Sequence, residues 1–122
     1  MGAEVRVEVV ALADEAVWLI ESPQGDWTLP GGPLMEGEDP ASGVRRWLGQ
    51  LAGVEPEEPI LLEAISRREG ERWQLILRYA CRLLQEPRPA PELPGSALFH
   101  IEHLPPLDVG QRAAIYRALQ VL

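Results

Sequence analysis

Apolar and polar residues alternate near the N-terminus in the pattern of a β-strand. Residues 3–12 carry a valine at every second position with charged residues between them, which predicts a strand with one buried face. A second apolar run covers residues 16–21, and a turn-forming acidic pair separates the two runs. We therefore predict a β-hairpin at the start of the chain, followed by a turn at 22–26 and a short strand at Trp27.

Two more apolar runs predict a second hairpin in the middle of the chain. Residues 59–66 and 73–84 are rich in Leu, Ile and aromatic residues, and a charged turn at 67–72 separates them. Such runs on either side of a short turn pair as antiparallel strands. Four prolines then fall between residues 85 and 95; they remove backbone donors and predict a loop, after which residues 96–101 form the last strand.

A helix is predicted over residues 41–52. Asp39 followed by Pro40 is a favourable start, because Asp accepts hydrogen bonds from the first backbone N–H groups and Pro suits the first helical position. Gly53 is a favourable end. An apolar stripe recurs between them at helical spacing, formed by Ala41, Val44, Leu48 and Leu51.

The C-terminal segment predicts a second helix over residues 108–121. Asp108 is its expected N-cap, because a short acidic side chain accepts hydrogen bonds from the first turn. Apolar residues recur at helical spacing here too, so one side of this helix is expected to face the core. We predict that this apolar face consists of Val109, Ile115, Tyr116, Leu119 and Leu122.

Composition narrows the class of protein. With 122 residues, 46% of them hydrophobic, the chain is long enough for one domain, 1–122, with its own core. The formal net charge of −8 argues against broad electrostatic binding to nucleic acid or anionic lipid. The sequence has no membrane-length apolar run and no signal-peptide pattern, so we expect a cytoplasmic protein. The single cysteine, Cys81, is interpreted as a buried structural thiol.

Candidate chemistry is concentrated in the glycine-rich loop that leads into the first predicted helix. This segment resembles the Nudix box of the Nudix (MutT-like) hydrolases, whose pattern is Gly, five residues, Glu, seven residues, then Arg-Glu-apolar-any-Glu-Glu-any-Gly-apolar. The frame matches without a gap, at Gly32, Glu38, Arg46, Leu48, Gly53 and Val54. The preceding Trp-x-Leu-Pro-Gly is also typical of the family. Three positions depart from the pattern, because Trp47, Gln50 and Leu51 replace its glutamates.

The resemblance implies a fold and an activity. The fold is α+β, a Nudix-type α/β/α sandwich with a central mixed β-sheet. Family members hydrolyse nucleoside diphosphate derivatives, and carboxylates on one helical face bind the Mg²⁺ or Mn²⁺ that activates the attacking water. Positions 47, 50 and 51 share such a face. Tryptophan and leucine offer no metal ligand, and glutamine offers only a neutral carbonyl oxygen. We therefore predict that the metal cluster and the hydrolase activity are lost.

The same resemblance implies candidate site residues. They are Glu38 and Arg46 for catalysis, Trp47 and Glu36 for substrate binding, and Gly31, Glu38, Gln50 and Glu92 for metal. Five of them have a structural alternative. The glycines serve loop geometry, Glu38 and Arg46 form an ion pair that holds the loop on the helix, Trp47 fills space or contacts a partner, and the acid of the proline-rich loop is solvated.

Three hypotheses for function follow from these residues. The first is a divergent Nudix-family protein without hydrolase activity, which binds a nucleotide-like ligand or a partner protein. The second is an active hydrolase of a nucleotide diphosphate derivative that uses Glu36, Glu38 and Glu92 in place of the missing acids. The third is an interaction module that forms homo-oligomers through Trp47 and neighbouring apolar residues.

Overall fold

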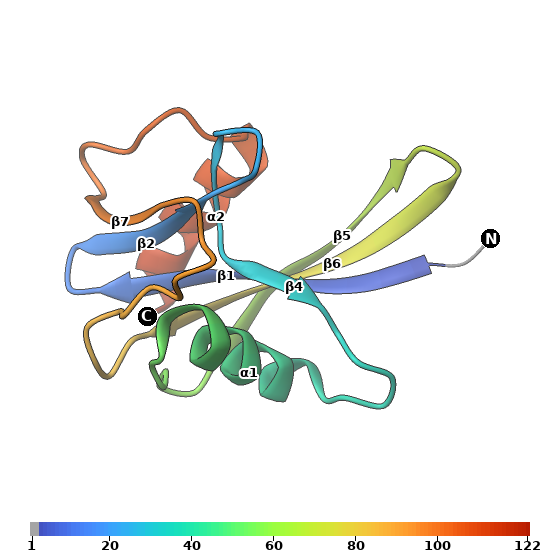
Figure 1. The fold of residues 1–122 in the computed structure, drawn as a ribbon, viewed down its shortest axis with the longest axis horizontal. Helices are drawn as coiled ribbons and strands as arrows, with labels where there is room; N and C mark the ends of the chain where they lie inside the picture. The colour runs from blue at the N-terminus through green and yellow to red at the C-terminus, as the bar shows by residue number, and fades with distance from the viewer. Residues whose placement is uncertain (1–2) are drawn as a thin grey trace.

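A mixed seven-stranded β-sheet lies between two helices (Figure 1). The computed structural model describes residues 3–122. In chain order its elements are β1 (Ala3–Ala13), β2 (Ala16–Glu21), β3 (Trp27–Thr28), β4 (Gly31–Pro33), α1 (Pro40–Ala52), β5 (Ile60–Glu69), β6 (Arg72–Arg82), β7 (Ser96–His100) and α2 (Val109–Val121). The strand order is β3-β2-β1-β6-β5, with β4 added to β1 and β7 added to β2. Neither helix in this part of the chain is long and apolar enough to cross a membrane. The predicted α+β class with a mixed sheet is confirmed.

β1 is the central strand of the sheet, and it is buried on both faces along residues 7–12. It pairs in parallel with β6 and antiparallel with β2 and β4. Its odd-numbered residues pack under α1, and Val10 and Leu12 pack under α2. The prediction of one buried face was wrong for this half of the strand, because helices cover both sides. We refer to the two sides as the α1 face and the α2 face.

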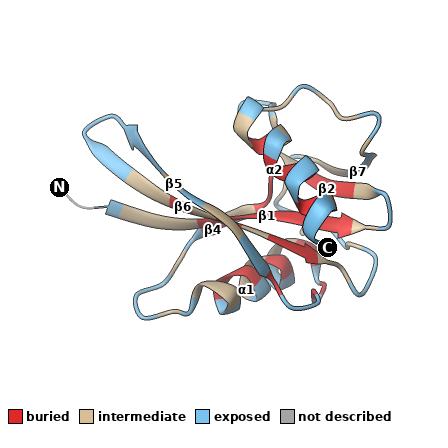
Figure 2. Ribbon diagram, turned by 180° about the vertical axis from the view of Figure 1, so that it is seen from behind, coloured by how far each residue is buried: buried red, intermediate tan, exposed pale blue. Residues whose placement is uncertain are grey.

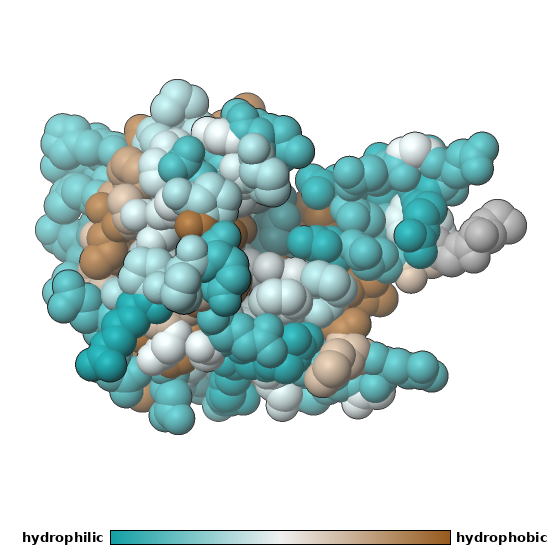
Figure 3. All heavy atoms as spheres, viewed as in Figure 1, coloured by the Kyte–Doolittle hydropathy of each residue, from teal (hydrophilic) through white to brown (hydrophobic). Residues whose placement is uncertain are grey.

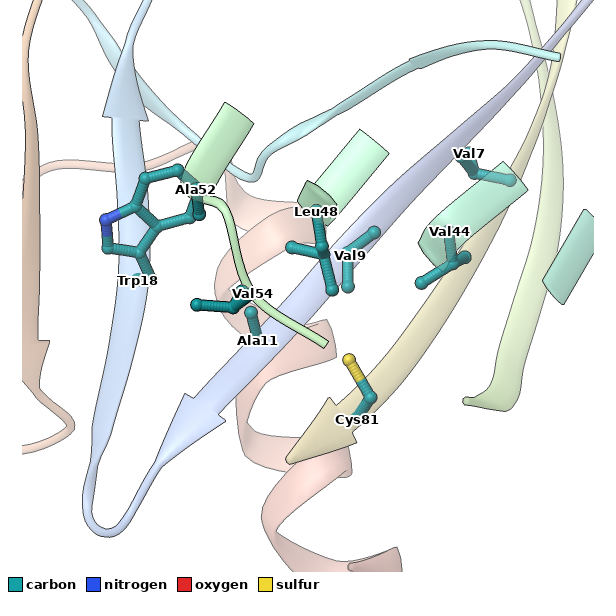
Figure 4. Close-up of a cluster of buried hydrophobic side chains, with 9 residues drawn as sticks. All are labelled: Val7, Val9, Ala11, Trp18, Val44, Leu48, Ala52, Val54 and Cys81. Atoms are coloured by element: carbon teal, nitrogen blue, oxygen red, sulfur yellow. The ribbon is translucent and has the colours of Figure 1, made fainter. Parts of the chain in front are cut away.

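α1 has the ends that the sequence predicts. The Asp39 carboxylate accepts a hydrogen bond from the Ser42 N–H at 3.2 Å, and Pro40 opens the helix. Gly53 ends it in the left-handed conformation, with φ of 61°, which an L side chain adopts only with strain. The buried residues beneath the helix form the first core cluster, drawn in Figure 4: Val7, Val9, Ala11, Trp18, Val44, Leu48, Ala52, Val54 and Cys81.

α2 begins after Asp108 as predicted, but a different side of it faces the sheet. Val109 is 83% exposed and Tyr116 is 47% exposed, so their predicted place on the apolar face was wrong. A polar residue of α2, Gln111, is buried instead. Gln111 donates to the Thr28 hydroxyl at 3.0 Å and accepts from the Leu29 N–H at 3.2 Å, so its burial leaves no polar group unpaired. The second core cluster contains Ala114, Ile115 and Ala118, with Leu119 and Leu122 packed against it.

The predicted hairpin of β5 and β6 is confirmed; β5 ends three residues later than predicted, and β6 begins one residue earlier and ends two residues earlier. They stay paired as far as Glu69 and Arg72, so the turn is only Gly70 and Glu71, and most of the predicted charged turn lies in strands. The end of the β5–β6 hairpin around the Gly70–Glu71 turn, together with the start of β1, extends beyond the helices, and we call this part the arm (Figure 1). Figure 3 shows the arm standing off from the remaining surface, with a hollow beneath it that contains hydrophobic residues.

Residues 85–95 contain no strand, in agreement with the four prolines, and β7 follows them at Ser96–His100 as predicted. Cys81 lies in the buried core beneath α1. Burial raises the pKa of its thiol to about 12, so the group stays protonated at neutral pH.

Candidate functional site

The glycine-rich part of the Nudix-like frame is held directly against β1. Gly31–Pro33 form the short strand β4, with Gly32 opposite Val7, and the sequence did not reveal this strand. A Cβ on Gly31 would overlap the carbonyl oxygen of Val7, and a Cβ on Gly32 would overlap the indole ring of Trp47. Both glycines are therefore required by the close packing around them, which supports their structural interpretation.

Trp47 fills the space between α1 and this loop. Its side chain is half-buried, and the ring lies on the bare backbone of Gly32. The indole Nε1 donates to the Pro33 carbonyl oxygen at 2.9 Å. The guanidinium carbon of Arg46 lies 4.9 Å from the centre of the Trp47 ring, within range of a cation–π contact. The indole thus joins helix to loop, and its polar N–H is already paired.

Glu38 and Arg46 form a two-bonded ion pair across the same junction. Arg46 Nε donates to Glu38 Oε2 at 2.8 Å, and Arg46 Nη2 donates to Glu38 Oε1 at 2.9 Å. The Met35 N–H also donates to Glu38 Oε1, at 3.0 Å. Hydrogen bonds from Arg46 and then Met35 lower the pKa of Glu38 to about 2. Both carboxylate oxygens are engaged, so the geometry favours the structural role of this pair.

The last turn of α1 is covered by the proline-rich loop. The Arg88 N–H donates to the Ala52 carbonyl at 2.7 Å, and the Ala90 N–H donates to the Leu51 carbonyl at 2.9 Å. These bonds satisfy carbonyls that a helix end leaves without partners. Leu51 and Leu93 both pack against the core cluster beneath α1. Apolar side chains therefore occupy this end of the helix, and the role of Leu93 was not evident from the sequence.

Comparison with known proteins gives different results for sequence and for structure. No family model matches the chain, and no curated protein matches it. Solved structures do match it. A MutT Nudix hydrolase from Burkholderia pseudomallei is 24% identical, with 96% of this chain and 98% of that one covered and a TM-score of 0.82. A Nudix-family hydrolase from Clostridium perfringens is 12% identical, with 99% of each chain covered and a TM-score of 0.80.

The chain has the Nudix fold. A UDP-X diphosphatase is similar as well, at 19% identity and a TM-score of 0.81, with 99% of this chain and 64% of that one covered. Identities of 24% or less establish the fold alone, because one fold can carry different activities.

The side chains at the Nudix-box positions do not fit a divalent metal. Neither Trp47 nor Leu51 has a donor atom that Mg²⁺ accepts, and the Gln50 side chain is exposed. Glu36 and Glu92 are also exposed, in two separate loops. Within residues 3–122, no group of three or more His, Cys, Asp or Glu side chains could hold a metal ion. The remaining acid of the frame, Glu38, is neutralised by Arg46.

A cleft of about 550 Å³ opens beside Gly31, between the arm and the β2–β3 turn. Its lining combines the apolar residues Ile20 and Leu93 with charged residues of both signs: Arg6, Arg67, Glu8, Glu21 and Glu69. Gln74 accepts from Arg67 Nε at 3.2 Å and donates to Glu4 at 3.0 Å, so hydrogen bonds hold the polar wall in place. The sequence did not indicate this cleft, since its residues come from segments far apart in the chain.

A buried ion network lies on the α2 face, close to the cleft. Arg78 is 2% exposed and donates to Glu8 at 2.8 Å and to Glu63 at 2.9 Å. Glu63 also accepts from Arg117 of α2, at 3.1 Å. The parallel pairing of β1 with β6 brings Glu8 beside Arg78. Two acids and two arginines thus neutralise each other, and they are not available to a metal.

Proposed function

We propose that this chain is a divergent Nudix-family protein that binds a nucleotide-like ligand and has lost metal-dependent pyrophosphohydrolase activity. One observation carries the proposal: Trp47 and Leu51 pack into the structure at positions where the Nudix box has acids. A diphosphate substrate needs a cation to offset its charge and to activate water. The described residues offer no carboxylate cluster for that cation.

The cleft beside Gly31 is the proposed binding site. It has an apolar wall that includes Ile20 and Leu93, and a hydrogen-bonded polar wall that includes Arg6 and Gln74. Ligand sites in proteins commonly combine these two kinds of surface. Because a similar structure is a UDP-X diphosphatase, nucleoside diphosphate derivatives are the ligands to test first. Beside the acids Glu8, Glu21 and Glu69, the cleft contains Arg6 and Arg67, and these two arginines are the cations that it offers to a phosphate.

The first test is a turnover assay over a panel of nucleoside diphosphate derivatives with Mg²⁺ or Mn²⁺. We expect no hydrolysis above the uncatalysed rate, because no acid is positioned to hold the metal. Metal-dependent turnover that disappears in Glu38→Gln would contradict the proposal and favour the hypothesis of an active hydrolase. That variant removes the one acid of the box that this chain retains.

A complementary test restores the acids. The combined variant Trp47→Glu, Gln50→Glu and Leu51→Glu returns three carboxylates to one helical face. If only these side chains are missing, the variant binds Mn²⁺ in calorimetric titration, whereas the unmodified chain does not. Circular dichroism checks that the variant is folded. A folded variant without metal affinity would show that the backbone of the site has diverged as well.

Ligand binding is tested by calorimetry with the same nucleotides, with and without a chelator. We expect the dissociation constant to be unchanged by the chelator and to rise in Arg6→Gln. Arg45→Gln is the matched control, because each arginine has one surface ion-pair partner, at 3.0 Å and 2.9 Å, and only Arg6 lines the cleft. Equal effects of both substitutions would exclude this cleft as the binding site.

A further inference from the structure

The outer edge of β5 has no partner strand among the described residues. β5 is the last strand in the sheet order and pairs only with β6. Figure 2 shows it running along the outside of the sheet, exposed over most of its length. The edge of a strand presents unpaired backbone N–H and C=O groups, and these can pair with a strand of another chain. β5 is ten residues long, and its pairing with β6 is regular from Glu63 to Glu69, so this part of the edge is a candidate for such pairing.

Apolar side chains are exposed on the same two strands. Leu61 is 51% exposed, Trp73 is 45% exposed and Ile60 is 40% exposed. At the middle of β5, Ala64 and Ser66 are small and exposed, so they leave room for a second backbone to approach. Charged residues commonly protect such an edge, and β5 carries Glu63, Arg68 and Glu69 as well as Arg67. The charge of Arg67 favours pairing if the neighbouring strand presents an acid opposite it.

We propose that two copies of this chain associate through β5, in an antiparallel pairing centred on Ile65. In this register Glu63 of each copy lies opposite Arg67 of the other, and Ile65 lies opposite itself. Glu63 and Arg67 both project to the α2 face, because they pair with Arg78 and Gln74 of β6. Each copy therefore contributes one acid and one base, and a two-fold axis gives two identical ion pairs.

The charges favour the register centred on Ile65, because a register centred on Ala64 would place no acid opposite a base. Moving the centre to Ser66 places Glu63 opposite Glu69, and moving it to Arg67 places two arginines opposite each other. Both arrangements oppose like charges, which destabilises cross-strand pairing. Glu63 already accepts from Arg78 and Arg117, one at each carboxylate oxygen, but each oxygen has a second lone pair for another donor. A segment without this acid–base spacing would not gain both ion pairs.

The pairing also fixes how the two copies are oriented. A two-fold axis perpendicular to the sheet keeps the same face of each copy on the same side of the joined sheet. The clefts beside Gly31 would then open on one side of the dimer, one on either side of the axis. The proposal places the interface on β5, away from Trp47, whose ring is packed on Gly32 within its own chain.

The mass in solution tests the proposal, by light scattering after size exclusion across a dilution series. We expect a concentration-dependent species of twice the 13.5 kDa chain mass. Arg67→Glu should abolish it, because each ion pair becomes a pair of like charges. Arg68→Glu is the matched control, with the same change of charge one residue further on, and it should leave the dimer intact. A monomer at every concentration, or equal loss in both variants, would overturn the proposal.

A second experiment does not depend on the affinity of the dimer. Residues opposite each other in an antiparallel pair have Cα atoms about 4.5–5.5 Å apart, within the range that a disulfide spans. Ile65→Cys should therefore form a disulfide-linked dimer under mild oxidation, whereas Arg68→Cys, which lies far from its own copy in this register, should not. The native Cys81 is buried and present in both variants, so any cross-linking through it would occur equally in both. Equal cross-linking of both variants would contradict the proposed register.

Discussion

The two faces of β1 are both buried, but they differ in where their charged residues lie. On the α1 face, where the Nudix-like frame lies, the core is formed by Val, Ala, Leu, Trp and Cys side chains. On the α2 face, Glu8 and Arg78 are buried next to each other and extend to Glu63 and Arg117. No buried side-chain N or O atom in residues 3–122 lacks a hydrogen-bond partner.

The difference shows what an acidic cluster requires. Carboxylates that are buried away from water need opposite charges within a few ångströms. Desolvating an unpaired charge costs more free energy than the packing of its side chain contributes. The α2 face supplies arginines for this purpose. In the Nudix hydrolases that the sequence resembles, a divalent metal provides the opposite charge for the acids on the corresponding helix. At the corresponding positions of α1 this chain has Trp47 and Leu51, which pack as an apolar contact, and Glu38 beside them is paired with Arg46.

The largest expected effect is on the α2 face. Arg78→Met keeps much of the side-chain volume but leaves Glu8 buried without its cation. Removing one partner of a buried pair costs about 3–5 kcal/mol of the free energy of unfolding. Urea denaturation followed by tryptophan fluorescence would measure this loss. Arg117→Met is the control; Arg117 is 47% exposed, and loss of its ion pair should cost at most about 1 kcal/mol. Equal costs would mean that the network is not the source of stability.

Much of the fold followed from local chemistry in the sequence. Asp39, Pro40 and Gly53 mark the ends of α1, and period-two patterns mark the long strands, because these signals act over a few residues. β4 was missed, since three residues that include two glycines carry no strand pattern. The orientation of α2 was wrong because the partners of Gln111, the Thr28 hydroxyl and the backbone of Leu29, lie more than eighty residues earlier in the chain.

The candidate site was predictable to a different extent. That residues 47, 50 and 51 are not acids is visible in the sequence alone. The contact of Trp47 with Gly32 is not visible, because it depends on how closely α1 approaches β4. The cleft beside Gly31 likewise forms from residues of several strands and loops, and no spacing in one sequence reports such a grouping. Glu36 and Glu92 lie in two separate loops, and their roles in substrate and metal binding remain predictions.

A smaller effect is expected at the contact between Trp47 and Gly32. Gly32→Ala adds a methyl group that overlaps the indole, and such overpacking costs about 1–3 kcal/mol. Trp47→Ala loses the ring contact and the hydrogen bond to Pro33, at a cost of about 2 kcal/mol for a half-buried side chain. In the double variant the added methyl meets empty space, so the two costs should not add. Denaturation of all four proteins gives the coupling, expected at about 1 kcal/mol.

Additive costs in that cycle would mean that Trp47 does not press on Gly32, and that the space on the α1 side is filled in another way. Gly37→Ala is a useful control, because a Cβ there meets nothing within 4 Å. Gly37 has φ of 76°, so this substitution reports backbone strain without overpacking. Its cost should be the same with and without Trp47.

The smallest effect concerns the pH dependence of the ion pair that holds the loop on α1. The pKa of Glu38 falls from 4.5 to about 2 on folding, chiefly through its hydrogen bonds from Arg46. A group with a lowered pKa stabilises the folded state above its unfolded pKa, and this contribution is lost as the pH falls through the folded pKa. The unmodified chain should therefore exceed Glu38→Gln in stability at neutral pH. The difference should shrink between about pH 4.5 and pH 2, as denaturation at several pH values would show.

Glu58→Gln, which removes an ion pair whose acid is 81% exposed, should cost little stability at any of these pH values. If the Glu38 difference did not change with pH, the loop would be held by the packing of Trp47 and not by the ion pair of Glu38 with Arg46.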